Sequence, residues 1–185
     1  MKFLIKYISL VILFLTLIYQ TRMHADFTAS KSNIIILPTL IILIVLNIVL
    51  LYSHDFTKKI QSKTTSLILS LLIILFGINL LFNYIQSKKE IALKLYVSPS
   101  FSLKQIGYEI KLYEDKTFEI NEYWHGESVH YFEKYILEKN YLTFIDDKIE
   151  EKTDYQITRN YKLNTKTHRF EALEKGFQKL KLRYY

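Results

Sequence analysis

Two histidines and two carboxylates lie close together in the second half of the chain, at His125, Glu127, His130 and Glu133. Imidazole and carboxylate groups are zinc ligands, and they also serve as general acids and bases. Their spacing matches no defined metal or catalytic motif, and the remaining histidine of this half, His168, lies far along the sequence. The four residues therefore form a candidate cluster, and we predict no catalytic residue, metal site or cofactor.

The composition excludes several other kinds of chemistry. The chain has no cysteine, which excludes disulfides, thiol catalysis and lipid attachment at a cysteine. Four glycines in 185 residues supply no glycine-rich phosphate-binding loop. The glycine-flanked serine of a nucleophile elbow is also absent from the sequence. We therefore do not expect an enzyme.

Three long apolar runs occupy the first half of the chain, at residues 3–20, 34–52 and 67–85. A helix needs about 20 apolar residues to cross a hydrocarbon core about 30 Å thick. Tyrosines, which favour the membrane interface, stand near the ends of the runs, at Tyr7, Tyr19, Tyr52 and Tyr84. The sequence therefore predicts a three-helix transmembrane region over residues 1–88, whose first run is an uncleaved anchor.

Polar residues within these runs are few. Asn79 and Asn83 are four residues apart and share one helix face, where Asn47 of the second run is expected to meet them. One interpretation is a polar site between helices. The other, which we favour, is helix–helix hydrogen bonding, worth on the order of 0.6 kcal/mol per bond. The lack of charged residues in the second and third runs argues against transport.

Lysines and arginines beside the runs predict the orientation. Lys2, Lys6 and the terminal amine outweigh Arg22 and Lys31 across the first run, and the three lysines of the loop after the second run outweigh the same pair. Basic loops tend to stay in the cytoplasm. We therefore expect an integral protein of a bacterial inner membrane, with a cytoplasmic N-terminus and an extracytoplasmic C-terminal domain.

Residues 95–185 have the period-two pattern of half-buried antiparallel strands. Tyr108–Tyr113 and Thr117–Tyr123 alternate apolar and polar residues around a short hairpin loop. Five further segments have strand character: Val129–Leu137, Tyr141–Ile145, Tyr155–Leu163, Thr167–Leu173 and Phe177–Tyr184. We predict an all-β antiparallel meander of about seven strands, closed as a small barrel or folded as a two-layer sheet.

The net charge of +7 is concentrated beside the apolar runs, so we expect no nucleic-acid partner. The sequence predicts a β-domain, anchored in the lipid bilayer, that binds an envelope protein, glycan or lipid. Two alternatives stay open: an immunity protein that protects the membrane from a toxin or lytic agent, and a metal-dependent envelope enzyme using His125, Glu127 and His130. The oligomeric state is left open.

Overall fold

The computed structural model describes residues 2–58, 63–97, 107–124 and 127–182, and it divides into two compact units. The first unit comprises the chain up to His24 together with Lys31–Ser87. The second comprises Ala25–Ser30 together with the chain from Lys88 onward. The short connection between the first two helices is thus part of the C-terminal unit.

The first unit contains three helices: α1 (Lys2–Thr21), α2 (Asn33–Thr57) and α3 (Lys63–Ser87). A stripe of buried residues along α1, spaced three and four apart as one helix face requires, packs on the other two helices. The buried members are Tyr7, Leu10, Phe14, Leu17, Ile44, Leu51 and Leu72. Many other apolar side chains of α2 and α3 face outward, including Leu50, which is 67% exposed.

Two of the described helices, α2 and α3, are long and apolar enough to cross a membrane. The apolar part of α1, Lys6–Thr21, is shorter. The structure therefore does not confirm the predicted count of three spans. In α2 the helix continues past the predicted end of its apolar run, because it includes His54 and Asp55 before it ends at Thr57.

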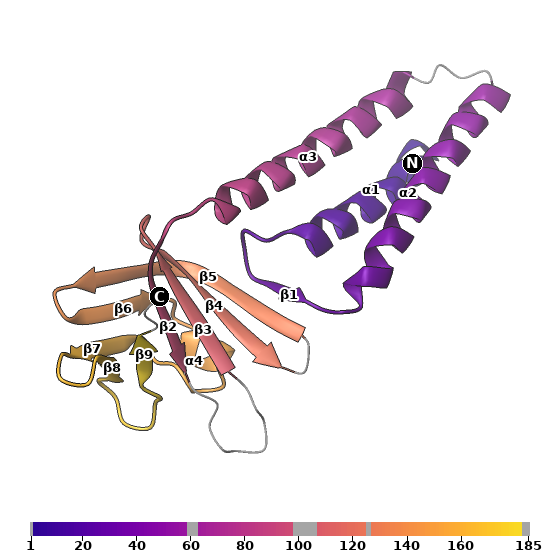
Figure 1. Ribbon diagram of the computed structural model, residues 1–185. Helices are drawn as coiled ribbons and strands as arrows, with labels where there is room; N and C mark the ends of the chain where they lie inside the picture. The colour runs from indigo at the N-terminus through magenta and orange to yellow at the C-terminus, as the bar shows by residue number, and fades with distance from the viewer. Residues whose placement is uncertain (1, 59–62, 98–106, 125–126, 183–185) are drawn as a thin grey trace. The chain divides into compact units, whose positions relative to one another are not determined.

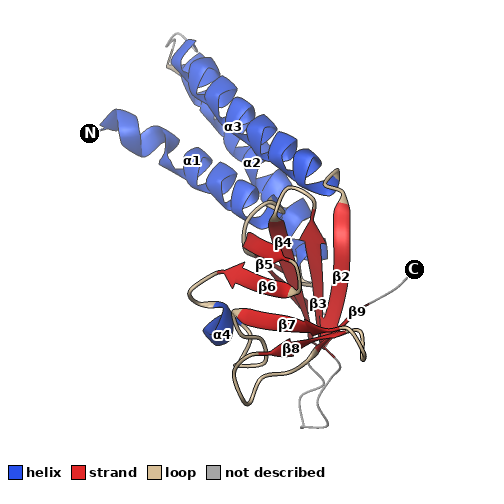
Figure 2. Cartoon of the chain, turned by 90° about the vertical axis from the view of Figure 1, so that its left-hand side faces the viewer, coloured by secondary structure: helices blue, strands red, loops and turns tan. Residues whose placement is uncertain are grey.

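The second unit is an antiparallel sheet that closes into a barrel of eight strands (Figures 1 and 2). Its strands follow the order β5-β4-β3-β2-β9-β8-β7-β6, and β6 pairs again with β5. Their bounds are β2 Ile91–Val97, β3 Gly107–Tyr113, β4 Thr117–Trp124, β5 Glu127–Glu138, β6 Tyr141–Ile145, β7 Asn160–Asn164, β8 Arg169–Ala172 and β9 Leu180–Leu182. This decides the predicted choice between a barrel and a two-layer sheet in favour of the barrel.

The strand prediction was wrong in two places. It omitted β2, which is apolar on both faces at Ala92 and Leu93 and so lacks clear alternation. It also extended a strand through Tyr155–Leu163, where the described chain has a short helix, α4 (Ile149–Lys152), then turns, and only then β7. The side chains of Ile157 and Thr158 are buried although neither residue belongs to a strand. Their residue types therefore resemble those of a strand in the sequence.

Alternating side chains fill the barrel interior. Leu95, Ile110 and Ile120 form one row across three adjacent strands, and each is fully buried. Phe144 packs edge-on against Phe118, with ring centroids 4.8 Å apart. Burying an apolar side chain of this size stabilises the fold by about 1.5–3 kcal/mol, so this interior holds the strands that carry the outward-facing polar residues.

An additional strand, β1 (Phe27–Ala29), comes from the connection between α1 and α2. It pairs with β5 at Ser128, Val129 and His130, on the edge opposite β4. Further along the same edge of β5, residues 134–138 pair with β6 instead. β1 therefore covers backbone groups of β5 that would otherwise form an open edge. A strand of three residues is too short for any sequence pattern to predict.

Candidate functional site

His130 lies on the outer face of β5 within a set of close partners. Its Nδ1 is 2.7 Å from Oε1 of Glu119 on β4, and its Nε2 is 3.0 Å from Oγ of Ser128. The ring stacks on Phe27 of β1, with centroids 4.2 Å apart and planes at 6°. Both imidazole nitrogens and one ring face are thus engaged by the protein itself.

Glu119 is the centre of this network and is only 7% exposed. Its Oε2 accepts hydrogen bonds from Tyr113 Oη at 2.5 Å and Lys111 Nζ at 3.1 Å. Burial by itself would raise the pKa of Glu119, but the hydrogen bonds from His130 and Tyr113 and the charge of Lys111 outweigh it and lower the pKa to about 2. The carboxylate therefore stays ionised at neutral pH, which suits a structural ion-pair network better than a general acid.

The predicted cluster is not assembled in the described part of the chain. His125 lies outside the described residues, and Glu127 accepts a hydrogen bond from Ser30 Oγ at 3.0 Å. Glu133 is exposed and occupies the face of β5 opposite His130, because it is an odd number of residues away in a regular strand. No group of three histidine or acidic residues able to hold a metal occurs among the described residues.

Glu119 was not predicted as the partner of His130. The information was present in the register of the predicted strands, because β4 and β5 pair as a hairpin with Asn121 opposite His130 and Glu119 opposite Phe132. Glu119 is therefore a diagonal neighbour of His130 on the same sheet face, within reach of long side chains. Pairing the two strands with Trp124 opposite Glu127 would have brought Glu119 and His130 together.

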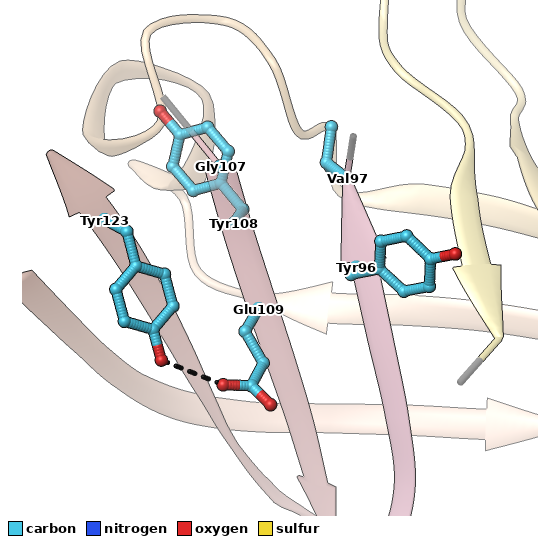
Figure 3. A pocket seen from close by; sticks show the side chains of 6 residues that line it. All are labelled: Tyr96, Val97, Gly107, Tyr108, Glu109 and Tyr123. Atoms are coloured by element: carbon cyan, nitrogen blue, oxygen red, sulfur yellow. Dashed lines mark hydrogen bonds between the residues drawn. The ribbon is translucent and has the colours of Figure 1, made fainter. Parts of the chain in front are cut away.

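A pocket of about 530 Å³ opens where β2 ends and β3 begins (Figure 3). Its described lining residues are Tyr96, Val97, Gly107, Tyr108, Glu109 and Tyr123. Glu109 accepts a hydrogen bond from Tyr123 Oη at 3.0 Å, marked by the dashed line in Figure 3. The volume lies within the roughly 300–1,000 Å³ of typical small-ligand pockets.

Tyr108 is the most unusual lining residue. It is 2% exposed, and its hydroxyl forms no hydrogen bond with any residue that the structure describes. Burial and the nearby carboxylates of Glu122 and Asp154 raise the pKa of Tyr108, which keeps the phenol neutral and able to donate. A buried polar group without a partner costs about 1–3 kcal/mol, so this hydroxyl is an energetically costly feature of the residue that lines the pocket.

The polar residues predicted within the helices all bond to α1. Asn47 Nδ2 donates to Ser9 Oγ at 2.9 Å, rather than meeting the other two asparagines. Asn79 Nδ2 donates to Thr21 Oγ1 at 3.1 Å, and Asn83 Nδ2 donates to the Thr21 carbonyl at 2.7 Å. These bonds link α2 to α1 at Ser9 and α3 to α1 at Thr21, as expected for helix–helix packing contacts.

The four tyrosines near the helix ends differ in their surroundings. Tyr7 is buried and its hydroxyl is 2.9 Å from Thr65 Oγ1, while the hydroxyl of Tyr52 is 2.9 Å from Ser66 Oγ. Tyr19 and Tyr84 are 59% and 61% exposed. Two of the predicted interface anchors therefore bond within the helical unit, and two present their rings outward.

Lys6 forms an ion pair with Asp55 of α2. The Asp55 side chain is 2% exposed and also accepts a hydrogen bond from Thr65 Oγ1 at 2.5 Å. The pair joins all three helices, because Lys6 lies on α1 and Thr65 on α3. Asp55 was not predicted as the partner of Lys6.

No protein family model matches this chain, and neither the curated proteins nor the solved structures include a significant match to it.

Proposed function

We propose that this chain is a small integral membrane protein whose barrel binds a ligand or partner at the envelope surface, without catalysis. Two features of the helical unit support the membrane location. α2 and α3 are 25-residue apolar helices, and only 17% of the most apolar stretch of each is buried within the structure. The core helices of a soluble protein bury most of such a stretch, whereas a membrane-spanning helix exposes it to lipid.

The position of β1 supports a specific topology. Because Ala25–Ser30 belongs to the barrel unit, the connection between α1 and α2 and the C-terminal barrel lie on the same side of the membrane. α2 and α3 then cross as a pair, with the connection between them on the other side. The loop lysines favour a barrel outside the cytoplasm and a cytoplasmic N-terminus.

The observation that carries the binding function is the pocket beside Tyr108. It combines a carboxylate, exposed aromatic surface and a residue whose buried hydroxyl lacks a partner among the described residues. Tyrosine rings supply contact area with a polar end, which is why they are common in binding sites. The described residues of the histidine and glutamate cluster lie apart, so no observation favours the alternative of a metal-dependent enzyme, and none favours the immunity protein.

The topology is tested by cysteine labelling, for which a chain without cysteine gives no background. Single replacements Thr28→Cys, Lys58→Cys and Lys139→Cys place a thiol at exposed positions of β1, the end of α2 and the β5–β6 turn. In intact cells, a membrane-impermeant maleimide should label the first and third and spare the second. Labelling of all three would show that α2 and α3 do not cross the membrane.

The binding function is tested with the full chain in lipid nanodiscs, because a fragment that starts at residue 90 lacks β1. The nanodiscs are incubated with arrays of envelope glycans and lipids and with solubilised envelope proteins. The double variant Tyr108→Phe, Glu109→Gln is the control. We expect at least one ligand to be retained by the wild type and lost by the variant. If both proteins retain the same ligands or neither retains any, the pocket is not the binding site.

A further inference from the structure

We propose that the pocket between β2 and β3 binds a small organic cation that carries an ammonium group, as ethanolamine and choline do. This inference rests on the proposed binding function and names the class of ligand. The shared ammonium chemistry occurs both in soluble amines and in lipid headgroups.

The charge of the pocket wall is the first argument. Glu109 is the one charged side chain among the described lining residues. Lys181 lies near Tyr96, with its Nζ 5.7 Å from the ring centroid, but it belongs to β9. Because β9 and β3 flank β2, Lys181 and Glu109 are register partners of Tyr96 on opposite sides. The β3 side of the pocket is therefore acidic.

The aromatic lining is the second argument. Figure 3 shows Tyr123 beside Glu109, and a hydrogen bond from the phenol fixes the carboxylate. Tyr123 is 47% exposed, so its ring is accessible to a ligand. An ammonium group is attracted to the face of an aromatic ring by about 0.5–2 kcal/mol, and recognition of quaternary ammonium groups by such rings is well established. A carboxylate beside a tyrosine ring suits a cation better than an anion.

The buried phenol is the third argument. Tyr108 lines the same pocket, and its buried hydroxyl has no hydrogen-bond partner among the described residues. The carboxylates of Glu122 and Asp154 are close enough to influence its ionisation, so the inner wall is acidic as well. The phenol faces the barrel interior, so Tyr108 adds to the acidic surroundings of the pocket and makes no direct contact with the ammonium group.

The test uses the full chain in phosphatidylglycerol nanodiscs, which contain no ammonium lipid. Saturation-transfer NMR detects binding of ethanolamine, choline and ethylene glycol, which is the neutral counterpart of ethanolamine. We expect both amines to bind and ethylene glycol not to bind. Equal binding of ethylene glycol would overturn the assignment to a cation.

Matched variants then locate the site. Glu109→Gln should weaken amine binding about tenfold, the equivalent of about 1.4 kcal/mol. Glu133→Gln removes an exposed carboxylate from β5, outside the described lining, and should leave the affinity unchanged. Tyr123→Phe removes the hydrogen bond to Glu109 but keeps the ring and the charge, so affinity should stay within about threefold. A Glu109→Gln variant that stays folded and binds amines as the wild type does would overturn the proposal.

The source of the ammonium group is resolved by repeating the titration in nanodiscs that contain phosphatidylethanolamine. Competition with soluble ethanolamine assigns the ligand to the lipid, and its absence assigns it to a soluble amine; either result supports the cation. If a neutral glycan binds instead and Tyr108→Phe abolishes that binding, the ligand class is wrong while the binding function stands. If no amine, glycan, lipid or envelope protein binds, both proposals fail.

Discussion

The imidazole ring of His130 lies flat against the phenyl ring of Phe27, with centroids 4.2 Å apart and an interplanar angle of 6°. The two residues are register partners across β1 and β5. Phe27 belongs to the connection between the first two helices, and His130 belongs to the barrel wall. This stacked pair therefore fastens a segment from the first part of the chain to the C-terminal unit, beside the ion-pair network of Glu119.

Replacing Phe27 by alanine should release β1 from β5 while the barrel stays folded. Stacked aromatic pairs contribute about 0.5–1.5 kcal/mol beyond the area they bury. We expect faster hydrogen exchange at the amides of β1 and Phe132, whose N–H donates to Asp26 at 2.8 Å. Exchange at the buried residues of β3 should not change. Thr28→Ala, at an exposed position of the same strand, is the control, and equal exchange in both variants would show that the stacked ring does not hold β1.

Replacing Glu119 by glutamine should remove a pH dependence of stability. The folded-state pKa of about 2 lies below the ordinary value of 4.5. The stabilisation is therefore present above about pH 4.5 and is lost as the pH falls toward 2, by on the order of 3 kcal/mol. Chemical unfolding of the barrel between pH 2 and 7 measures this. A wild type and a variant with parallel pH profiles would contradict it.

Lys152 should couple energetically to Asp26. Its Nζ is 3.0 Å from Asp26 Oδ2 and 2.9 Å from Asp146 Oδ2. Burial would lower the pKa of Lys152, but these carboxylates raise it overall. A double-mutant cycle with Lys152→Met and Asp26→Asn should give a coupling of about 0.5 kcal/mol at pH 7, because Asp26 is 43% exposed and solvent screens the pair. The coupling should shrink in high salt, and a value that salt does not alter would argue against an ionic origin.

Lys6 and Asp55 should show the energetics of a buried ion pair. Asp55→Leu alone removes the partner of Lys6 and should destabilise the helical unit, because the ammonium group is left without its carboxylate. Adding Lys6→Met should recover most of this loss, because no charge is then left without a partner. Unfolding in mixed micelles measures both variants. A double variant no more stable than Asp55→Leu would show that the charges matter for another reason.

Much of the fold could be predicted from local sequence patterns. The β3–β4 and β5–β6 hairpins were predicted because alternating strands flank short polar turns, in which Lys116 and Lys139 take positive φ values of 65° and 51°. The strand that follows α4 was misplaced, because buried loop residues such as Ile157 imitate alternation. Of the network around His130, only His130 itself was predicted, because its partner Glu119 is specified by strand register rather than by distance along the chain.

The sequence by itself determined the apolar runs that became α1 to α3 and most strands of the barrel. These follow from the length and period of apolar residues, which are local properties of the chain. Only the tertiary structure decided the closure of β5 on β6, the addition of β1 and the pocket beside Tyr108. These depend on which distant strands pair and in which register. That choice is made by burial of the shared interior and not by any single segment.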